Sequence, residues 1–261
     1  MRNAHDATRM HPPTTQAKLQ PSTSRCQELQ RFCQTLGLNT ADSPDPTRTF
    51  ALLNEALTHT SAGLTIHHER LEFLGDAVLR LAASEFIEQH YPQLPVGERS
   101  ALRAQLVSDR WLAQLGEQIG IDTVLVVGAK TKGDTAGQAT LRAEASEALI
   151  GALYQSWNDL KPVHTWLTPH WERTSAAVLA DPHKGNAKSA LQEWSQARKL
   201  GLPSYSSHET SQKHGDPRRF HCRVILKGDL LAEGWGGSRR EAEQKAAQVA
   251  LQRLEGDSTP D

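Results

Sequence analysis

Three acidic side chains in one short segment have a spacing that could bind a metal ion. Glu69, Glu72 and Asp76 stand at positions i, i+3 and i+7, so on a helix their carboxylates would share one face. Aligned like charges repel, and a solvated acidic face usually interleaves Lys or Arg, whereas only Arg70 lies nearby, off this face. A solvated acidic stripe remains the alternative interpretation.

A second acidic pair lies in a different predicted helix. Glu144 and Glu147 stand at i and i+3, and small or apolar residues surround them up to Leu153. Carboxylates in an apolar run need a partner, and oxygen ligands without Cys or His suit Mg²⁺ or Mn²⁺ rather than Zn²⁺. Gly151 would let a second helix pack closely. The two segments predict a divalent metal site, provided that their helices meet.

The elements that must position these carboxylates are predicted to be helical. Residues 25–37 carry an apolar i, i+3, i+4, i+7 pattern that ends at Gly37. Further breaks fall at residues 92–97 and 128–137, which contain Pro or Gly. Between the breaks, helices are expected over residues 50–58, 69–90, 100–116 and 140–157. The prediction is an all-α domain over residues 25–180.

The first 24 residues have a different composition. Residues 1–24 are rich in Thr, Ser, Pro and Gln and poor in aliphatic side chains, so they could not offset the entropy lost on ordering. A transit peptide is the alternative, because Arg2 and Arg9 stand among hydroxyl residues, but Pro12 and Pro13 interrupt any amphipathic helix. We therefore expect a flexible N-terminal tail.

The net charge of −1 conceals two parts of opposite sign. Residues 1–183 carry 16 Lys and Arg against 20 Asp and Glu, a net charge of −4. Residues 184–255 carry 13 against 8, a net charge of +5, and the last six residues add −2. An acidic part followed by a basic part suggests that the basic part meets a polyanion.

The basic part has its own pattern of elements. After a linker at residues 181–186, a domain is expected over residues 187–255, followed by a tail at residues 256–261. Alternation of side chains over residues 220–227 predicts a strand, and Ser238 is placed to cap a helix that reaches about residue 254. The remaining expected elements are a helix over 187–199 and strands over 203–209 and 229–235. The expected order is α-β-β-β-α.

Composition narrows the class of protein. The chain has 261 residues, of which 38% are hydrophobic, enough for two domains with cores of their own, and it has no apolar run long enough to span a membrane. Cys26, Cys33 and Cys222 are scattered without CxxC spacing, so neither a disulfide framework nor a zinc knuckle is favoured. These features fit a reducing cytoplasm.

Two motifs resemble the signatures of bacterial ribonuclease III. The run HERLEFLGD at residues 68–76 resembles the first signature, in which the first residue is usually Asn, and RAEASEALIGALY at residues 142–154 resembles the second acidic motif. The resemblance implies a homodimeric endonuclease that cuts double-stranded RNA with Mg²⁺ or Mn²⁺. It also implies 5′-phosphate and 3′-hydroxyl ends with short 3′ overhangs, in RNA processing such as maturation of ribosomal RNA precursors.

The same resemblance assigns roles to individual residues. By family match Asp76 and Glu147 are catalytic, Glu69 assists at the active site, and Phe73 packs at the dimer interface. The implied metal ligands are Glu72, Asp76, Glu144 and Glu147. The mechanism implied is phosphodiester hydrolysis in which metal ions activate water and stabilise the leaving 3′ oxygen.

Two further positions depart from the family pattern. Glu144 stands where the family usually has Asp, and Val96 stands where an acidic residue often precedes the Gly that matches Gly97. Because Mg²⁺ demands nearly ideal octahedral geometry, the extra methylene of Glu144 is expected to weaken activity or alter the metal preference.

Residues 184–255 resemble a double-stranded RNA-binding domain, in the motifs AKSALQEWSQ, PSY, FHCRV and SRREAEQKAA. Such domains recognise the shape, 2′-hydroxyls and phosphates of A-form RNA. His214 is a candidate loop contact, because Asp216 occupies the position where the family usually has His. The other RNA contacts implied by family match are Ser189, Gln192, Glu193, Gln196, Arg239, Arg240 and Lys245. An ordinary solvated helix face is the alternative for the last three.

Two other functions remain open from the sequence. One is a double-stranded RNA-binding protein or chaperone that does not cut, whose acidic half only dimerises; the acidic motifs argue against it. The other is a helical scaffold in which Glu69, Glu72 and Asp76 pair with Arg side chains, which predicts no magnesium-dependent cleavage.

Overall fold

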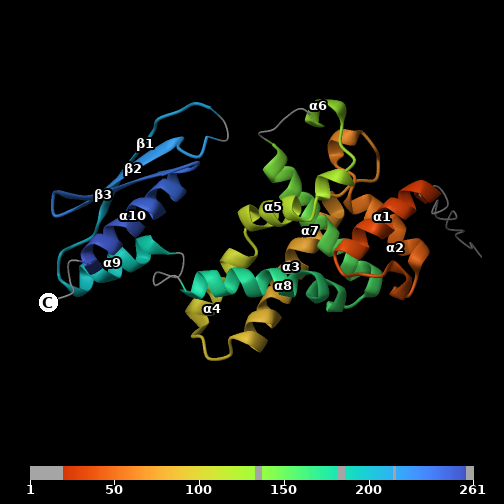
Figure 1. Cartoon of the computed structure of the whole chain (residues 1–261), viewed down its shortest axis with the longest axis horizontal. Coiled ribbons are helices and arrows are strands. Elements are labelled where there is room, and N and C mark those ends of the chain that lie inside the picture. Colours follow the sequence, from red (N-terminus) through yellow and green to blue (C-terminus); the bar gives the residue numbers. More distant parts are fainter. Residues whose placement is uncertain (1–19, 133–136, 181–185, 214–215, 257–261) are drawn as a thin grey trace, which may run out of the picture.

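The chain folds into a helical domain followed by a smaller domain that contains a β-sheet (Figure 1). This computed structural model describes residues 20–132, 137–180, 186–213 and 216–256. The predicted linker at 181–186 and the two predicted tails fall largely outside these residues. The described part shows the all-α domain and the α-β-β-β-α order that were predicted.

The helical domain is built from these elements: α1 (Thr23–Thr35), η1 (Thr40–Asp42), α2 (Pro46–Ala56), η2 (Thr60–Ala62), α3 (Glu69–His90), α4 (Val96–Leu106), α5 (Asp109–Gln118), η3 (Ile121–Thr123), α6 (Ala129–Lys132), α7 (Gln138–Trp157) and α8 (Lys161–Ala180). Helix α1 begins at Thr23, so the end of the predicted tail is helical; the Ser22 hydroxyl accepts a hydrogen bond from the Arg25 N–H. Helix α6 lies within the predicted break at 128–137, and α8 was not separately predicted.

The bounds of α3 are confirmed, but the single helix predicted over residues 100–116 is wrong. The chain instead forms α4 and α5, and α4 ends at Leu106. Ser108 starts the second helix, because its hydroxyl accepts a hydrogen bond from the Trp111 N–H at 3.3 Å. The apolar periodicity runs through this break and conceals it.

Helix α7 lies at the centre of the helical domain and packs against α2, α3 and α5. Its residues Leu149, Ile150 and Leu153 are fully buried. Trp166 and Trp171 of α8 complete the core from another side. Since α7 is surrounded, a polar residue on it must face either a cleft or another polar group.

The C-terminal domain consists of α9 (Ala187–Ala197), β1 (Ser204–Glu209), β2 (Phe220–Leu226), β3 (Asp229–Gly236) and α10 (Arg239–Gly256). The strands form one antiparallel sheet in the order β1-β2-β3. Cys222 and Val224 point to the helices and are fully buried. No helix in the described residues is long and apolar enough to cross a membrane.

Candidate metal centre and RNA-binding surface

The two acidic helices are in backbone contact through a pair of glycines. A Cβ atom at Gly75 of α3 would lie 1.8 Å from the carbonyl oxygen of Glu147 on α7. A Cβ at Gly151 of α7 would lie 2.2 Å from the carbonyl oxygen of Leu71. Only glycine permits this approach. The predicted metal site required the two acidic helices to meet. In the structure they do, because they pack together beside their acidic residues.

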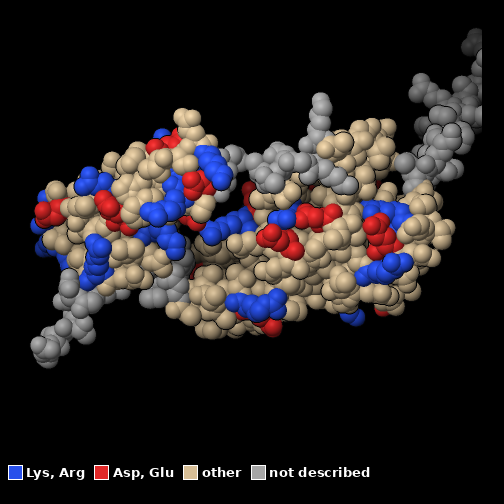
Figure 2. Space-filling model, turned by 45° about the horizontal axis from the view of Figure 1, so that its top comes forward, with Lys and Arg blue, Asp and Glu red and all other residues tan. Residues whose placement is uncertain are grey.

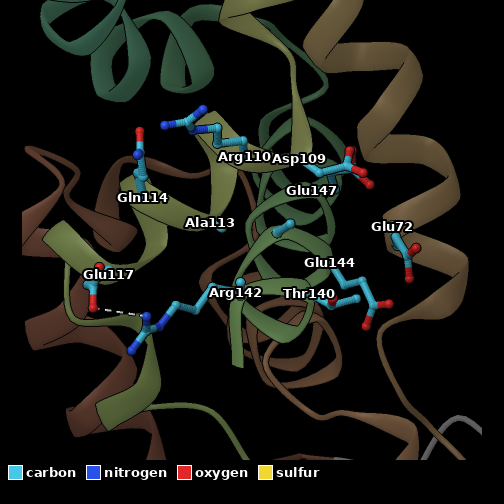
Figure 3. A pocket seen from close by; sticks show the side chains of 12 residues that line it. Glu72, Asp109, Arg110, Ala113, Gln114, Glu117, Thr140, Arg142, Glu144 and Glu147 are labelled. Atoms are coloured by element: carbon cyan, nitrogen blue, oxygen red, sulfur yellow. Dashed lines mark hydrogen bonds and ion pairs between the residues drawn. The ribbon is translucent and has the colours of Figure 1, made fainter. Parts of the chain in front are cut away.

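The carboxylates of the two helices line one cleft. A cavity of about 500 Å³ is lined by Glu72 from α3 and by Glu144 and Glu147 from α7. Figure 3 shows Glu72 facing the two α7 side chains across the space between the helices. A neighbouring cavity is lined by Glu69, Glu72, Asp76 and Glu147. The structure thus brings together the five acidic residues singled out in the sequence.

Asp109 belongs to the same cleft and was missed in the sequence. It is the first residue of α5 and lies near Glu147 in Figure 3. Its negative charge contributes to raising the pKa of Glu147. The Ser108-Asp109 pair has the form of a helix start, which is the signal that could have revealed it. Inside a single helix over 100–116 it would instead be an ordinary surface residue.

The electrostatics of the cleft favour uptake of a cation. Burial, followed by the charges of Asp76, Glu72 and Asp109, raises the pKa of Glu147 to about 7. Burial and the charges of Glu144 and Glu69 also raise the pKa of Glu72. A bound cation would relieve this repulsion. The residues therefore fit a hard divalent ion, since carboxylate oxygens from both helices converge on one cleft.

Asp76 is held by an arginine one turn further along α3. The Arg80 Nε lies 2.9 Å and 3.0 Å from the two carboxylate oxygens of Asp76, and an Arg80 terminal nitrogen lies 2.8 Å from one of them. This pair fixes the orientation of the carboxylate. The Asp76 side chain raises the pKa of the Arg80 guanidinium, chiefly through the hydrogen bond.

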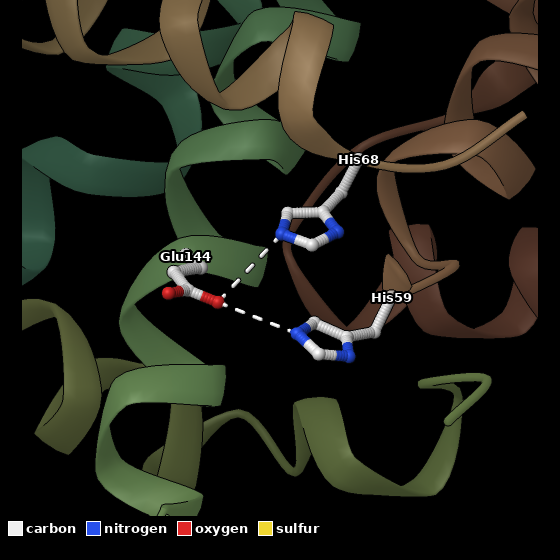
Figure 4. Close-up of side chains that lie close together, drawn as sticks. All are labelled: His59, His68 and Glu144. Carbon is white, nitrogen blue, oxygen red and sulfur yellow. Dashed lines mark ion pairs between the residues drawn. The ribbon is translucent and has the colours of Figure 1, made fainter. Parts of the chain in front are cut away.

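Two histidines, His59 and His68, lie against Glu144 (Figure 4). The Nε2 atoms of His59 and His68 are each 3.6 Å from Glu144 Oε2. His68 Nε2 is also 3.2 Å from Glu72 Oε2. His68 is only 3% exposed, and its ring stacks on that of His59 with centroids 4.8 Å apart. The acidic cleft therefore has an imidazole edge.

Three other predicted positions lie around the cleft. The side chain of Glu69 is 65% exposed and lies 3.8 Å from His67 at the rim. Phe73 is 85% exposed on α3 and also lines the neighbouring cavity. Val96 is exposed at the first position of α4, so it supplies no carboxylate there.

The predicted RNA-contacting side chains lie on the surface of the C-terminal domain. Ser189 and Gln192 on α9 and Arg240 on α10 line one cavity. Arg239 and Lys245 are exposed in the first turns of α10, where the Ser238 hydroxyl accepts a hydrogen bond from the Glu241 N–H. Glu193 and Gln196 are exposed on α9. The predicted contact His214 lies outside the described residues.

The charges of the two domains differ on the face seen in Figure 2, where Lys and Arg gather over the C-terminal domain and a group of Asp and Glu lies on the helical domain. An ion pair joins the domains, with 3.3 Å between Arg110 of α5 and Glu241 of α10. The basic surface and the acidic cleft thus belong to neighbouring but separate structures.

Comparison with known proteins identifies both domains. Residues 50–158 match the family described as Ribonuclease-III-like, and residues 187–254 match the double-stranded RNA binding motif. The chain is 57% identical to "Ribonuclease 3" of Prochlorococcus marinus over 203 residues, which covers 78% of this chain and 82% of that protein. It is 44% identical to "Ribonuclease 3 2" of Nostoc sp. (77% and 83%) and 40% identical to "Ribonuclease 3" of Gloeobacter violaceus (88% and 93%). The chain therefore belongs to the ribonuclease III family, with a nuclease domain followed by a double-stranded RNA-binding domain.

Proposed function

We propose that this protein is an endoribonuclease that hydrolyses phosphodiester bonds in double-stranded RNA with divalent metal ions, Mg²⁺ or Mn²⁺. The observation that carries the proposal is the cleft in which carboxylates from α3 and α7 meet, in one chain with a double-stranded RNA binding motif. Members of this family depend on divalent metals. The proposed ligands are Glu72, Asp76, Glu144 and Glu147.

The side chains of the cleft have distinct tasks in this proposal. When bound, the metal would activate water and stabilise the leaving 3′ oxygen. Glu147 and Asp76 are the proposed catalytic residues. With its pKa raised to about 7, the Glu147 carboxyl is about half protonated at neutral pH, and a bound cation would displace that proton. Arg80 keeps Asp76 oriented, and Glu69, at the rim, assists from the side that is open to solvent.

The C-terminal domain holds the duplex in this proposal. Gln192 and Ser189 of α9 face a minor groove, together with Glu193 and Gln196, while Arg239, Arg240 and Lys245 contact phosphates. The N-terminus of α10 adds backbone N–H groups and a favourable dipole. His214 remains a candidate contact in the loop before Phe220. The basic charge of residues 184–255 supports this role.

The proposed active form is a homodimer in which each subunit cuts one strand. Phe73 and Leu81 lie two turns apart on α3 and are exposed, and a second copy would bury these apolar side chains. Each cleavage would leave a 5′ phosphate and a 3′ hydroxyl, and the offset between the two sites would leave short 3′ overhangs.

The proposed domain limits follow the changes in composition. The nuclease domain is assigned to residues 25–180 and the RNA-binding domain to residues 187–255, with a linker at 181–186 and tails at 1–24 and 256–261. We place the protein in the cytoplasm, where processing of structured transcripts such as ribosomal RNA precursors would supply duplexes. The three cysteines are free, as they would be in a reducing compartment.

The test is cleavage of a long RNA duplex by the purified full-length protein, with Mg²⁺ and with chelator alone. We expect short duplex products with 3′ overhangs only when the metal is present, and no cutting of the matching DNA duplex. Firm duplex binding without cleavage in either Mg²⁺ or Mn²⁺ would instead identify a binding protein that does not cut.

A further inference from the structure

The hydrogen bonds of the two histidines beside Glu144 fix different protonation patterns on their rings. The Nδ1 of His68 lies 3.3 Å from the carbonyl oxygen of Thr58. A carbonyl can only accept, so this Nδ1 carries a proton and donates. In a neutral His68 the remaining nitrogen, Nε2, therefore presents a lone pair. That nitrogen faces the acidic cleft.

His59 has the opposite arrangement. The backbone N–H of Ser61 donates to its Nδ1 at 3.1 Å, so Nδ1 accepts and Nε2 carries the proton. This Nε2 points at Glu144 Oε2, 3.6 Å away. His59 is thus arranged to hold the carboxylate of Glu144, while His68 is arranged to offer a ligand atom.

The surroundings of His68 Nε2 consist of acceptors. Glu72 Oε2 lies 3.2 Å from it and Glu144 Oε2 lies 3.6 Å from it. A lone pair facing two carboxylate oxygens is repulsive, so either a proton or a cation must stand between them. Two ligands each about 2.1 Å from one ion lie roughly 3.0–3.4 Å apart at octahedral or tetrahedral angles. The observed separations approach this spacing.

The segment that carries the histidines is fixed before any ion binds. The Leu57 carbonyl accepts from the Val126 N–H, and the His59 N–H donates to the Val126 carbonyl, both at 2.9 Å. The His68 N–H donates to the Thr58 carbonyl at 2.9 Å, so Thr58 oxygen holds both the backbone and the ring of His68. Such outer contacts orient a metal-binding imidazole.

We propose that His68 Nε2 is a metal ligand beside Glu72 and Glu144, with His59 as a positioning residue that acts through Glu144. An imidazole nitrogen among carboxylates favours borderline ions, so the site takes Mn²⁺ or Co²⁺ more readily than an all-oxygen site would. Two of the positions where the chain departs from the ribonuclease III pattern, His68 and Glu144, lie against each other. The inference rests on the proposed metal centre.

The test uses the full-length, untagged protein with Mn²⁺ as a spectroscopic probe. Pulsed electron paramagnetic resonance of the wild type at one equivalent of Mn²⁺ should show coupling to a ¹⁴N nucleus. The coupling should disappear in His68→Asn, which keeps a side-chain N–H donor but has no Nε2. It should persist in the control His164→Asn, because His164 pairs with Glu85 at 3.0 Å in another part of the domain.

Binding titrations give the second measurement. His68→Asn should weaken Co²⁺ binding about tenfold and change Mg²⁺ binding by less than about twofold, because Mg²⁺ prefers oxygen ligands. Equal weakening of Co²⁺ and Mg²⁺ binding in His68→Asn, or loss of the nitrogen coupling in His164→Asn, would overturn the assignment. If His68→Asn does not fold, the wild-type spectrum decides alone, since absence of nitrogen coupling excludes ligation by His68.

These measurements do not require cleavage. RNA cutting by a protein whose bound Mn²⁺ shows no nitrogen coupling would leave the proposed function intact and remove the inference. Nitrogen coupling in a protein that never cuts duplex RNA would support ligation by His68 and contradict the proposed function.

Discussion

The nuclease domain and the RNA-binding domain both pack a helix through glycine, yet they place their charges differently. Gly75 brings α3 onto α7, and a Cβ at Gly234 of β3 would lie 2.3 Å from the Ala246 nitrogen of α10. In the nuclease domain the acidic groups lie beside the contact and raise the pKa of Glu147. In the RNA-binding domain the core is mostly small and apolar, and cations such as Arg240 extend into solvent.

This difference follows from what each domain must do. A metal centre needs several like charges fixed at short range, so the fold must hold them in partial burial until a cation arrives. A duplex-binding surface needs charges that can adjust to phosphates, and long exposed side chains supply them. We therefore expect the metal centre to depend most on the rigid packing around Gly75, and duplex binding to depend most on the charges around α10.

The largest effect is expected on the stability of the nuclease domain, from the substitution Gly75→Ala. A Cβ 1.8 Å from a backbone oxygen cannot be accommodated without separating α3 from α7, which should cost about 3 kcal/mol or more and lower the urea midpoint of the nuclease domain. Gly97→Ala is the matched control, because nothing lies within 4 Å of the added methyl. Gly234→Ala should lower only the transition of the RNA-binding domain. Equal unfolding midpoints for Gly75→Ala and Gly97→Ala would contradict the close contact.

The next largest effect is expected on the rate of cleavage, with little change in RNA binding. Glu147→Gln should reduce single-turnover cleavage at least ~10³-fold, because metal binding contributes several kcal/mol of transition-state stabilisation. Duplex binding should stay within about twofold, since the RNA-binding domain is untouched. Glu172→Gln, at an exposed position of α8, controls for the loss of one carboxylate. Unchanged cleavage by Glu147→Gln would refute its assignment as a ligand.

Removal of residues 184–261 should separate the two domains' contributions. The two hydrophobic cores are distinct, and the exposed ion pair between Arg110 and Glu241 is worth little, so residues 1–183 should remain folded. We expect affinity for duplex RNA to fall about 100-fold and its salt dependence to flatten, with residual cutting at low salt. A folded truncation that keeps the full chain's affinity and salt slope would show that the nuclease domain itself holds the duplex.

A smaller effect concerns the pH dependence of stability without metal. The pKa of Glu147 is raised to about 7, so its charged form destabilises the folded state, and stability should fall as pH rises from about 4.5 through 7. Glu147→Gln should therefore be more stable than the parent at pH 8, by about 1–2 kcal/mol after discounting for partial exposure, and equally stable at pH 4.5. Thermal unfolding in chelator measures this. A constant difference across that range would mean that the carboxyl is not perturbed.

The smallest expected effect is a few-fold change in metal preference. Mn²⁺ should support cutting at least as well as Mg²⁺, and Glu144→Asp should shift the rate ratio towards Mg²⁺, because the shorter side chain withdraws its oxygen from His59 and His68. The alternative is that a small backbone displacement absorbs the methylene. Identical Mg²⁺ to Mn²⁺ single-turnover ratios in the two proteins would favour that alternative.

Features that depend on local periodicity could be predicted from the amino-acid sequence alone. The helix Glu69–His90 was predicted with its observed bounds, and the strand Phe220–Leu226 was predicted one residue too long, because the spacing of apolar and polar side chains follows the geometry of one element. The acidic faces of α3 and α7 could be found in the same way. The break between α4 and α5 at Ser108 could not be found in this way, because apolar residues continue through the break and only the helix cap marks its place.

Which of these groups meet depends on how the helices pack against one another. Glu147 and Gly75 are far apart in the chain, and their backbone contact depends on how two complete helices pack. The same packing brings Asp109 to the cleft and sets His68 against Glu144. Sequence spacing predicts which residues are neighbours within one helix or strand. A metal centre takes its residues from several elements, so the residues that form it are known only once those elements pack together.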